Sequence, residues 1–218
     1  MGIITRSAAN NITTSGVILP AGINDASVAS ITALAQVSAG DGITLISSQT
    51  ASASASLSFT TGIDSTYRTY LFKFINIHPA TDGVIFQFNL STDGGSSYNV
   101  TKTTTVFTAW VSESGTGDSL QYRDGLDLAQ STSYQELVSD VGADNDQNAC
   151  GYLYLFNPSS NIFVKHFISN FQNTHQSDYT MQEFLAGYGN TTSAINAINF
   201  NMSSGNIDAG TIHMYGIA

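Results

Sequence analysis

Cysteine, proline and charged residues are all scarce in this chain of 218 residues, and each scarcity excludes a class of protein. The single cysteine, Cys150, excludes an intrachain disulfide, so covalent cross-links cannot stabilise the fold. No run of about 18 apolar residues occurs, which excludes a membrane-spanning helix. Charged residues make up only 10% of the chain, whereas hydrophobic residues make up 42%, which is enough to build a core and excludes wholesale disorder.

Positive charge is the rarest feature of all. The chain contains six Lys and Arg residues and sixteen Asp and Glu residues, which gives a formal net charge of −10 and a pI of about 4.4. A protein with so few cations neutralises few phosphates, so nucleic acid is a poor partner, and anionic membrane surfaces are disfavoured for the same reason. Residues 1–6 also lack the cationic and apolar segments of a signal peptide, so we expect no secretion.

Aromatic residues are absent from the first fifty positions, and all of them fall within residues 59–218. A segment of that kind has little to bury by itself, and we interpret residues 1–42 as an N-terminal arm. Apolar residues at helical spacing predict one short helix in this arm, over residues 25–36. A lone helix of this length is marginal in water, so it must pack against the body or another subunit. The residues expected to make that contact are Ile18, Leu19, Ile31 and Leu34.

From Ile43 onward the hydrophobic period becomes two, which is typical of strands. Apolar residues alternate with serine over residues 51–59. Similar strands are expected over 70–75, 84–90, 100–111, 152–156, 162–171, 181–188, 195–202 and 211–217, with turn signals between them. Many short strands with almost no helix predict an all-β fold. We expect an antiparallel β-sandwich, jelly-roll-like, over residues 43–218.

The apolar members of these alternating sets predict the core. They are Phe59, Tyr70, Phe72, Phe74, Val84, Phe86, Phe88, Leu90, Leu153, Leu155, Ile162, Val164, Phe184, Ile198, Phe200, Ile212 and Met214.

Residues 113–149 interrupt this pattern. The segment is polar and acidic, its apolar residues are scattered, and it contains one expected strand near 134–138. We interpret it as a long surface excursion, which is usually functional in a compact domain. Asp140, Asp144, Asn145 and Asp146 offer oxygen ligands, but their spacing does not match a calcium-binding loop. We therefore expect a solvated acidic loop and no metal.

Motifs that carry chemistry are missing. His78, His166, His175 and His213 stand singly, without the spacing of a helical metal site. The chain contains neither a Gly-x-Ser-x-Gly nucleophile motif nor a glycine-rich phosphate-binding loop. Acidic neighbours raise rather than lower the pKa of a thiol, so Cys150 is not expected to be a nucleophile. We predict no catalytic residue and no cofactor, and therefore no enzyme.

Three segments resemble a module common in virion proteins of tailed bacteriophages. They are residues 67–83 (YRTYLFKFINIHPATDG), residues 86–98 (FQFNLSTDGGSSY) and residues 202–217 (MSSGNIDAGTIHMYGI). The chain is similar over about residues 43–218 to small structural, decoration or tail-fibre-like proteins of marine and cyanobacterial phages. No catalytic or binding residues are implied by this resemblance.

The resemblance implies a non-enzymatic structural protein, located in the virion and assembled in the host cytoplasm. Without a coiled-coil shaft or repeats, a capsid decoration (cement) protein is favoured over a tail-fibre or baseplate subunit. The expected partners are the major capsid protein or tail subunits and further copies of the chain, as a homotrimer by analogy. A second hypothesis is a carbohydrate-binding module for host surface glycans, in which Trp110, Tyr122 and Tyr134 form a sugar platform with the acidic loop.

Overall fold

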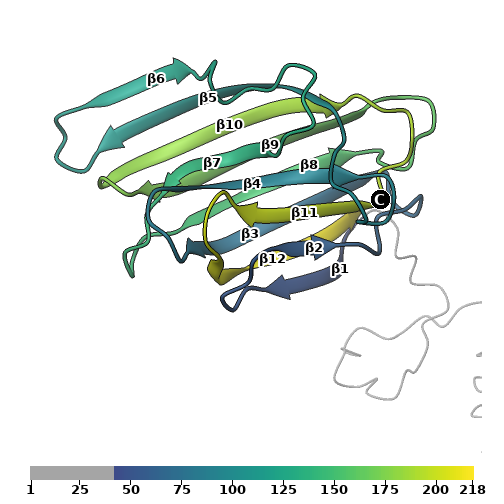
Figure 1. Ribbon diagram of the computed structural model, residues 1–218, viewed down its shortest axis with the longest axis horizontal. Coiled ribbons are helices and arrows are strands. Elements are labelled where there is room, and N and C mark those ends of the chain that lie inside the picture. Colours follow the sequence, from purple (N-terminus) through teal and green to yellow (C-terminus); the bar gives the residue numbers. More distant parts are fainter. Residues whose placement is uncertain (1–41) are drawn as a thin grey trace, which may run out of the picture. The chain divides into compact units, whose positions relative to one another are not determined.

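The computed structural model describes residues 42–218, which form twelve strands and no helix (Figure 1). The short helix expected over residues 25–36, and Ile18, Leu19, Ile31 and Leu34, lie outside the described residues. The strands are β1 (Ile43–Thr50), β2 (Leu57–Phe59), β3 (Thr69–Pro79), β4 (Val84–Ser91), β5 (Lys102–Ser112), β6 (Asp118–Tyr122), β7 (Gln135–Val141), β8 (Ala149–Phe156), β9 (Lys165–His175), β10 (Tyr179–Gly189), β11 (Ala197–Met202) and β12 (Ile207–Ile217).

The strands form one continuous twelve-stranded sheet that folds over into two layers, and every pairing is antiparallel. We call the run β1-β12-β3-β8-β9-β10-β5-β6 the larger sheet and the run β7-β4-β11-β2 the smaller sheet. In Figure 1 the smaller sheet lies in front of the larger one. One residue pair, Val141 of β7 with His175 of β9, links the two sheets at a corner. The all-β antiparallel prediction is therefore confirmed for the described residues.

Eight of the strands follow a nested pattern of pairing. β1 pairs with β12, β2 with β11, β3 with β8, and β4 with β7, so the first pairs with the last and the middle two pair together. The hairpins β5–β6 and β9–β10 lie outside this pattern and pair with each other through β5 and β10. They extend the larger sheet beyond the edge of the smaller one (Figure 1).

Aromatic rings fill the space between the two sheets. Phe200 of the smaller sheet has its ring centroid 5.6 Å from that of Phe72 and 5.0 Å from that of Phe74, both on the larger sheet. Phe74 also lies 4.8 Å from Phe171 of β9. The alternation that predicted this core holds in β3, β4, β11 and β12, because every predicted core residue on those strands is buried.

Three predicted core residues are wrong. Ile162 is 74% exposed, and Val164 is only half-buried, because β9 begins at Lys165 rather than at residue 162. Phe184 is half-buried on the opposite side of β10, whose inward residues are Met181, Glu183 and Leu185. Hydrophobicity alone favours Phe184 inside and Glu183 outside. The structure reverses them because polar partners on β7 satisfy the glutamate.

The strand predicted over residues 51–59 is also mostly wrong. Only Leu57–Phe59 is a strand, and residues 51–56 form a bent connection in which Ala53 has a φ of 48°. Ala51 N donates to Gly210 O, and Ser54 pairs with Ile207 in an isolated bridge. The alternating Ala and Ser residues therefore carry the chain from the larger sheet to the smaller one, since their small side chains tolerate the bend.

The segment 113–149 is not only a surface excursion. It contains the unexpected strand β6, and it contains β7, whose Leu137, Val138 and Val141 are buried. Between these strands the chain follows β5, where Thr104 N donates to Leu128 O and Lys102 pairs with Ser131. The acidic segment thus contributes one strand to each sheet, and the stretch between those strands lies along β5.

Candidate functional site

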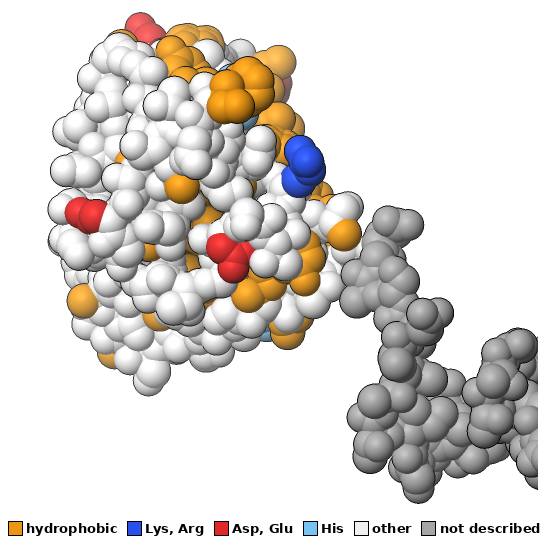
Figure 2. Space-filling view, turned by 90° about the vertical axis from the view of Figure 1, so that its right-hand side faces the viewer, with side chains coloured by type: hydrophobic (Ala, Val, Ile, Leu, Met, Phe, Trp, Pro, Cys, Tyr) orange, Lys and Arg blue, Asp and Glu red, His pale blue; other side chains and the backbone are white. Residues whose placement is uncertain are grey.

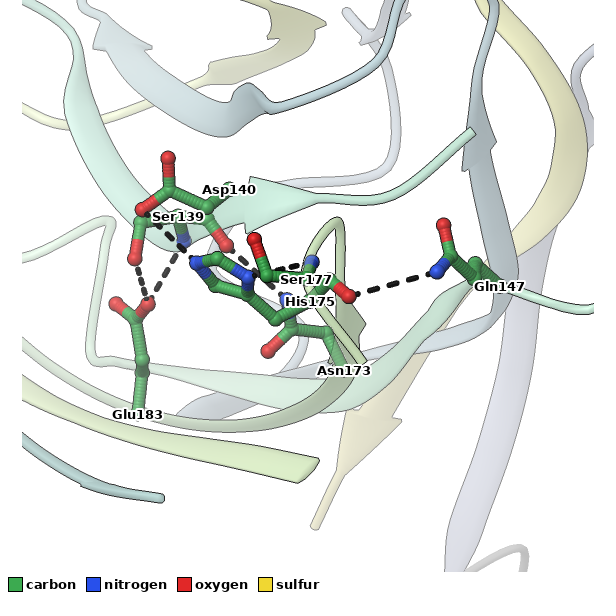
Figure 3. Close-up of polar contacts among 7 residues, drawn as sticks. All are labelled: Ser139, Asp140, Gln147, Asn173, His175, Ser177 and Glu183. Atoms are coloured by element: carbon green, nitrogen blue, oxygen red, sulfur yellow. Dashed lines mark hydrogen bonds and ion pairs between the residues drawn. The ribbon is translucent and has the colours of Figure 1, made fainter. Parts of the chain in front are cut away.

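A buried polar cluster lies where the acidic segment meets the larger sheet (Figure 3). Glu183 of β10 is 1% exposed, and its Oε1 accepts hydrogen bonds from Ser139 N at 2.8 Å and from Ser139 Oγ. Asn173 Nδ2 of β9 donates to Ser139 O at 3.0 Å. Ser139 of β7 is therefore bonded to both neighbouring strands of the larger sheet. These contacts fasten β7 where the hydrogen-bonded link between the sheets is a single residue pair.

A second carboxyl group lies close to the first. Burial, followed by the charge of Glu183, raises the pKa of Glu136 to about 8, while Arg123 lowers it in part. Burial also raises the pKa of Glu183, against the two Ser139 donors and Arg123. Glu136 Oε1 has no hydrogen-bond partner among the described residues. At neutral pH the Glu136 carboxyl is therefore mostly protonated, since its pKa lies above 7.

The edge of this cluster contains a histidine. His175 Nε2 lies 3.7 Å from Asp140 Oδ2, and His175 Nδ1 accepts from Ser177 N at 3.0 Å (Figure 3). Gln147 Nε2 donates to His175 O at 3.5 Å, and the His175 ring lies against Tyr179 with centroids 5.1 Å apart. Carboxyl groups and an imidazole, as this cluster contains, are the groups that perform general acid–base chemistry. Both glutamates are buried and are not accessible to a substrate, whereas the Asp140 side chain beside His175 is 39% exposed.

Two buried lysines lie at the opposite end of the same strands. Lys102 of β5 and Lys165 of β9 both pair with Gly189 of β10, so the three residues form one row across the sheet. Lys102 Nζ donates to Asn89 Oδ1 and to Val100 O, and burial lowers its pKa to about 7. Lys165 Nζ donates to the carbonyls of Phe163 and Thr191. Both ammonium groups bind backbone or amide oxygens, so they hold loops rather than carboxylates.

The accessible feature is on the other side of the larger sheet. We define the outer face as the side of β8, β9, β10, β5 and β6 that points away from the smaller sheet. Among the strand residues that point to this face, Asp118, at the end of β6, is the one Asp, Glu, Lys or Arg residue, and His166 of β9 is the one histidine. Large exposed hydrophobic residues on it are Phe107, Val111, Leu120, Tyr122, Tyr152 and Ile168.

An aromatic ridge divides this outer face. Phe107 of β5 and Phe184 of β10 stack with centroids 4.7 Å apart and planes 11° apart, and Tyr122 of β6 pairs with Phe107. One hollow of about 430 Å³ lies on one side of the ridge, over Ala186. A second hollow of about 400 Å³ lies on the other side, over Ala109. The ridge and the two hollows arise because the small side chains of Ala186 and Ala109 lie on either side of the Phe107–Phe184 pair.

The two hollows differ in chemistry. The hollow over Ala186 is walled by Ile168, His166 and Tyr188, with threonine hydroxyls of β5, and its lining contains no Asp, Glu, Lys or Arg. The hollow over Ala109 includes Asp118, Gln172 and Gln182. Figure 2 shows the body from the side: its surface is mostly uncharged, with scattered hydrophobic side chains that are densest toward the top and right, and with isolated acidic and basic groups.

The structure does not bring the proposed sugar platform together. Tyr122 points to the outer face and donates to Asp127 Oδ2 at 2.6 Å. Trp110 points to the inner side of β5, where it stacks on Tyr179 with centroids 4.9 Å apart. Tyr134 donates to Asn199 Oδ1 of the smaller sheet at 3.0 Å. The three rings lie in different environments. Tyr122 pairs with Phe107, whereas Trp110 lies three positions further along β5 and so faces the opposite side, and Tyr134 precedes β7.

The acidic loop is tied to its own neighbours. Asp140 pairs with His175, and Asp144 O accepts from Gln147 N at 2.8 Å. Within residues 42–218, no three His, Cys, Asp or Glu side chains gather as they would to hold a metal ion. Cys150 is half-buried and its Sγ accepts from Asn76 N at 3.2 Å. No helix long and apolar enough to cross a membrane occurs in the described part of the chain.

Sequence reasoning missed the outer face. The signal was present in β10, where Phe184 is followed by Ala186 and Tyr188 at alternate positions. Of these residues only Phe184 was predicted, and it was predicted as a core residue, because hydrophobicity does not say which side of a strand is covered. Comparison with protein families, with curated proteins and with solved structures finds no match to this chain.

Proposed function

We propose that this protein is a non-enzymatic structural protein of a tailed-bacteriophage particle, placed on its outer surface as a capsid decoration protein. The observation that carries the proposal is the outer face of the larger sheet. Six exposed hydrophobic side chains contribute on the order of 100 Å² each, so the patch reaches roughly 600 Å² before half-buried rings are counted. Patches of this size mark surfaces that pack against other proteins.

The chemistry of the described groups supports an assembly role. Glu183 holds β7 in place through Ser139, and the two buried lysines hold the loops beside them. The proposed partners are the major capsid protein or tail subunits and further copies of the chain. A tail-fibre or baseplate subunit is the alternative position, since it would use the same face.

We assign the body to the jelly-roll class, with β5–β6 and β9–β10 as inserted hairpins. The nested pairing of the other eight strands, four in each sheet, supports this assignment. Viral capsid domains and lectins are both built on jelly rolls, so the fold is compatible with the proposal without selecting it.

A carbohydrate-binding module is the second candidate function. The hollow over Ala186 favours it, because Tyr188 and His166 rings lie beside the hydroxyls of Thr103 and Thr105. Aromatic faces combined with a few polar groups are typical of small-ligand sites. This candidate replaces the platform of Trp110, Tyr122 and Tyr134.

The test uses purified particles of the phage whose genome encodes the chain. Mass spectrometry is expected to find the chain as a stoichiometric component, and cryo-electron microscopy to place it on the outer shell. Deleting residues 1–42, which include Ile18, Leu19, Ile31 and Leu34, is expected to leave a folded body that no longer loads. Absence of the chain from particles refutes the virion role, and selective binding on a glycan array then supports the second candidate.

A further inference from the structure

The shape of the outer face is self-complementary, because it has a ridge next to a hollow. The Phe107–Phe184 ridge stands between two hollows, and the hollow over Ala186 lies next to it along both β5 and β10. Two copies placed face to face and related by a twofold axis can each insert a ridge into the hollow of the other. In such an isologous interface residue i contacts residue j and j contacts i, so one ridge and one hollow suffice.

The size of the face fits a stable pair. A standard protein interface buries about 800 Å² on each partner, a little over half of it apolar. The exposed hydrophobic side chains of the outer face alone offer roughly 600 Å², and Phe184, Tyr154 and Tyr188 add half-buried rings. Aromatic residues are also the type enriched at the centres of interfaces.

Charge favours a second copy over a charged partner. The chain carries a formal net charge of −10, so two copies repel each other through most of their surfaces. The outer face contributes one acidic side chain, Asp118, and this residue borders the hollow over Ala109. The hollow over Ala186 contains no Asp or Glu, and His166 is the titratable imidazole in its lining, so it is the hollow through which two negatively charged copies approach at least cost.

We propose that two copies of this chain pair through their outer faces, with Phe107 and Phe184 of each copy inserted over Ala186 of the other. The inference rests on the proposed function in that both assign this face to assembly. It differs from the trimer expected by analogy, because an isologous contact closes at two copies.

The experiment measures the mass of the full chain by light scattering and analytical ultracentrifugation. The wild-type protein is expected at twice its 23.1 kDa mass. Ala186→Gln fills the hollow and Phe184→Thr removes half of the ridge, and each is expected to weaken pairing at least tenfold. Ala109→Gln makes the same substitution in the other hollow and is the matched control, expected to pair like the wild type. Circular dichroism checks that each variant is folded.

Three results overturn the pairing. They are a monomer at concentrations up to about 100 µM, a trimer, or equal effects of Ala186→Gln and Ala109→Gln. Should Ala186→Gln fail to fold, Phe184→Thr decides alone, since its side chain is already half-exposed. A monomeric chain that is still found on phage particles rejects the pairing while leaving the virion role intact. A chain that pairs in solution but is absent from phage particles supports the pairing and refutes the virion role.

Discussion

Glu183 shows how a single residue joins distant parts of this chain. Its carboxylate accepts two hydrogen bonds from Ser139, which lies 44 positions earlier in the sequence and on the other sheet. Glu136 lies near it with a raised pKa and an unpartnered oxygen. The Glu183 carboxylate is thus stabilised by hydrogen bonds, whereas burial and the charge of Glu183 favour the protonated, neutral form of Glu136. This is the expected outcome when two acids share a buried site.

Replacing Glu136 by glutamine is expected to stabilise the protein at alkaline pH. The folded-state pKa of Glu136 is about 8, above the ordinary value of 4.5, so the folded state binds more protons between these two pH values. Stability of the wild type therefore falls as pH rises through this window, on the order of a few kcal/mol in all. The Glu136→Gln variant should lose that slope, as measured by urea unfolding at pH 4.5, 6 and 8.

The control for this experiment is Glu113→Gln, which removes the same formal charge from an exposed position between β5 and β6. Its unfolding free energy should follow the wild type at each pH. Parallel curves for the wild type and Glu136→Gln would mean that the Glu136 carboxyl ionises normally in the folded protein.

At the scale of elements, β8 and β9 approach closely because β8 carries a glycine. A Cβ added to Gly151 would lie 2.5 Å from Asn170 O and 2.6 Å from the Phe171 ring. Phe171 faces Gly151 directly across the two strands and reaches Phe74 and Phe86 in the core. The glycine therefore makes room for a ring that belongs to the contact between the sheets.

Gly151→Ala is expected to destabilise the protein by roughly 1–3 kcal/mol, because either the β9 backbone or the Phe171 ring must move. Chemical denaturation measures the loss. Gly125→Ala is the matched control, since nothing lies within 4 Å of its added Cβ. The control should be neutral or slightly stabilising. An unchanged stability for Gly151→Ala would show that β8 and β9 can separate without cost.

At the scale of the whole molecule, the two layers of the body depend on aromatic contacts between them. Phe200 on the smaller sheet contacts rings on both sheets, namely Phe59, Phe72, Phe74, Phe86 and Phe88. Only one residue pair links the sheets by backbone pairing, at the β7–β9 corner. Side-chain packing therefore has to supply most of the attraction between them.

Phe200→Ala is expected to cost roughly 3–5 kcal/mol, as large cavities in a packed core do. Thermal and urea unfolding should show the loss. Ile162→Ala, at a residue that is 74% exposed, is the control and should change stability by less than about 0.5 kcal/mol. A loss at Phe200 as small as that of the control would place the main contact between sheets elsewhere.

The sequence alone determined the fold class and much of the core. Strict alternation over β3, β4, β11 and β12 identified both the strands and the buried side, since these strands face each other across the core. One of the turn signals between the expected strands is Asp-Gly-Gly at residues 93–95, which follows β4 as a turn in which Asp93 Oδ1 accepts from Ser97 N at 2.9 Å. The jelly-roll assignment, the arm and the virion role stay proposals.

Tertiary structure decided which side of the remaining strands is inside. Lys165 and Glu183 lie inward while Phe184 and Ile168 lie outward, the reverse of what hydrophobicity predicts. The physical reason is that a buried polar group is stable only when bonded, and its partners come from other strands: Ser139 for Glu183, the carbonyls of Phe163 and Thr191 for Lys165. The amino-acid sequence shows the two-residue period of a strand. Which side of the strand is buried depends on hydrogen-bond partners from segments that are distant in the sequence.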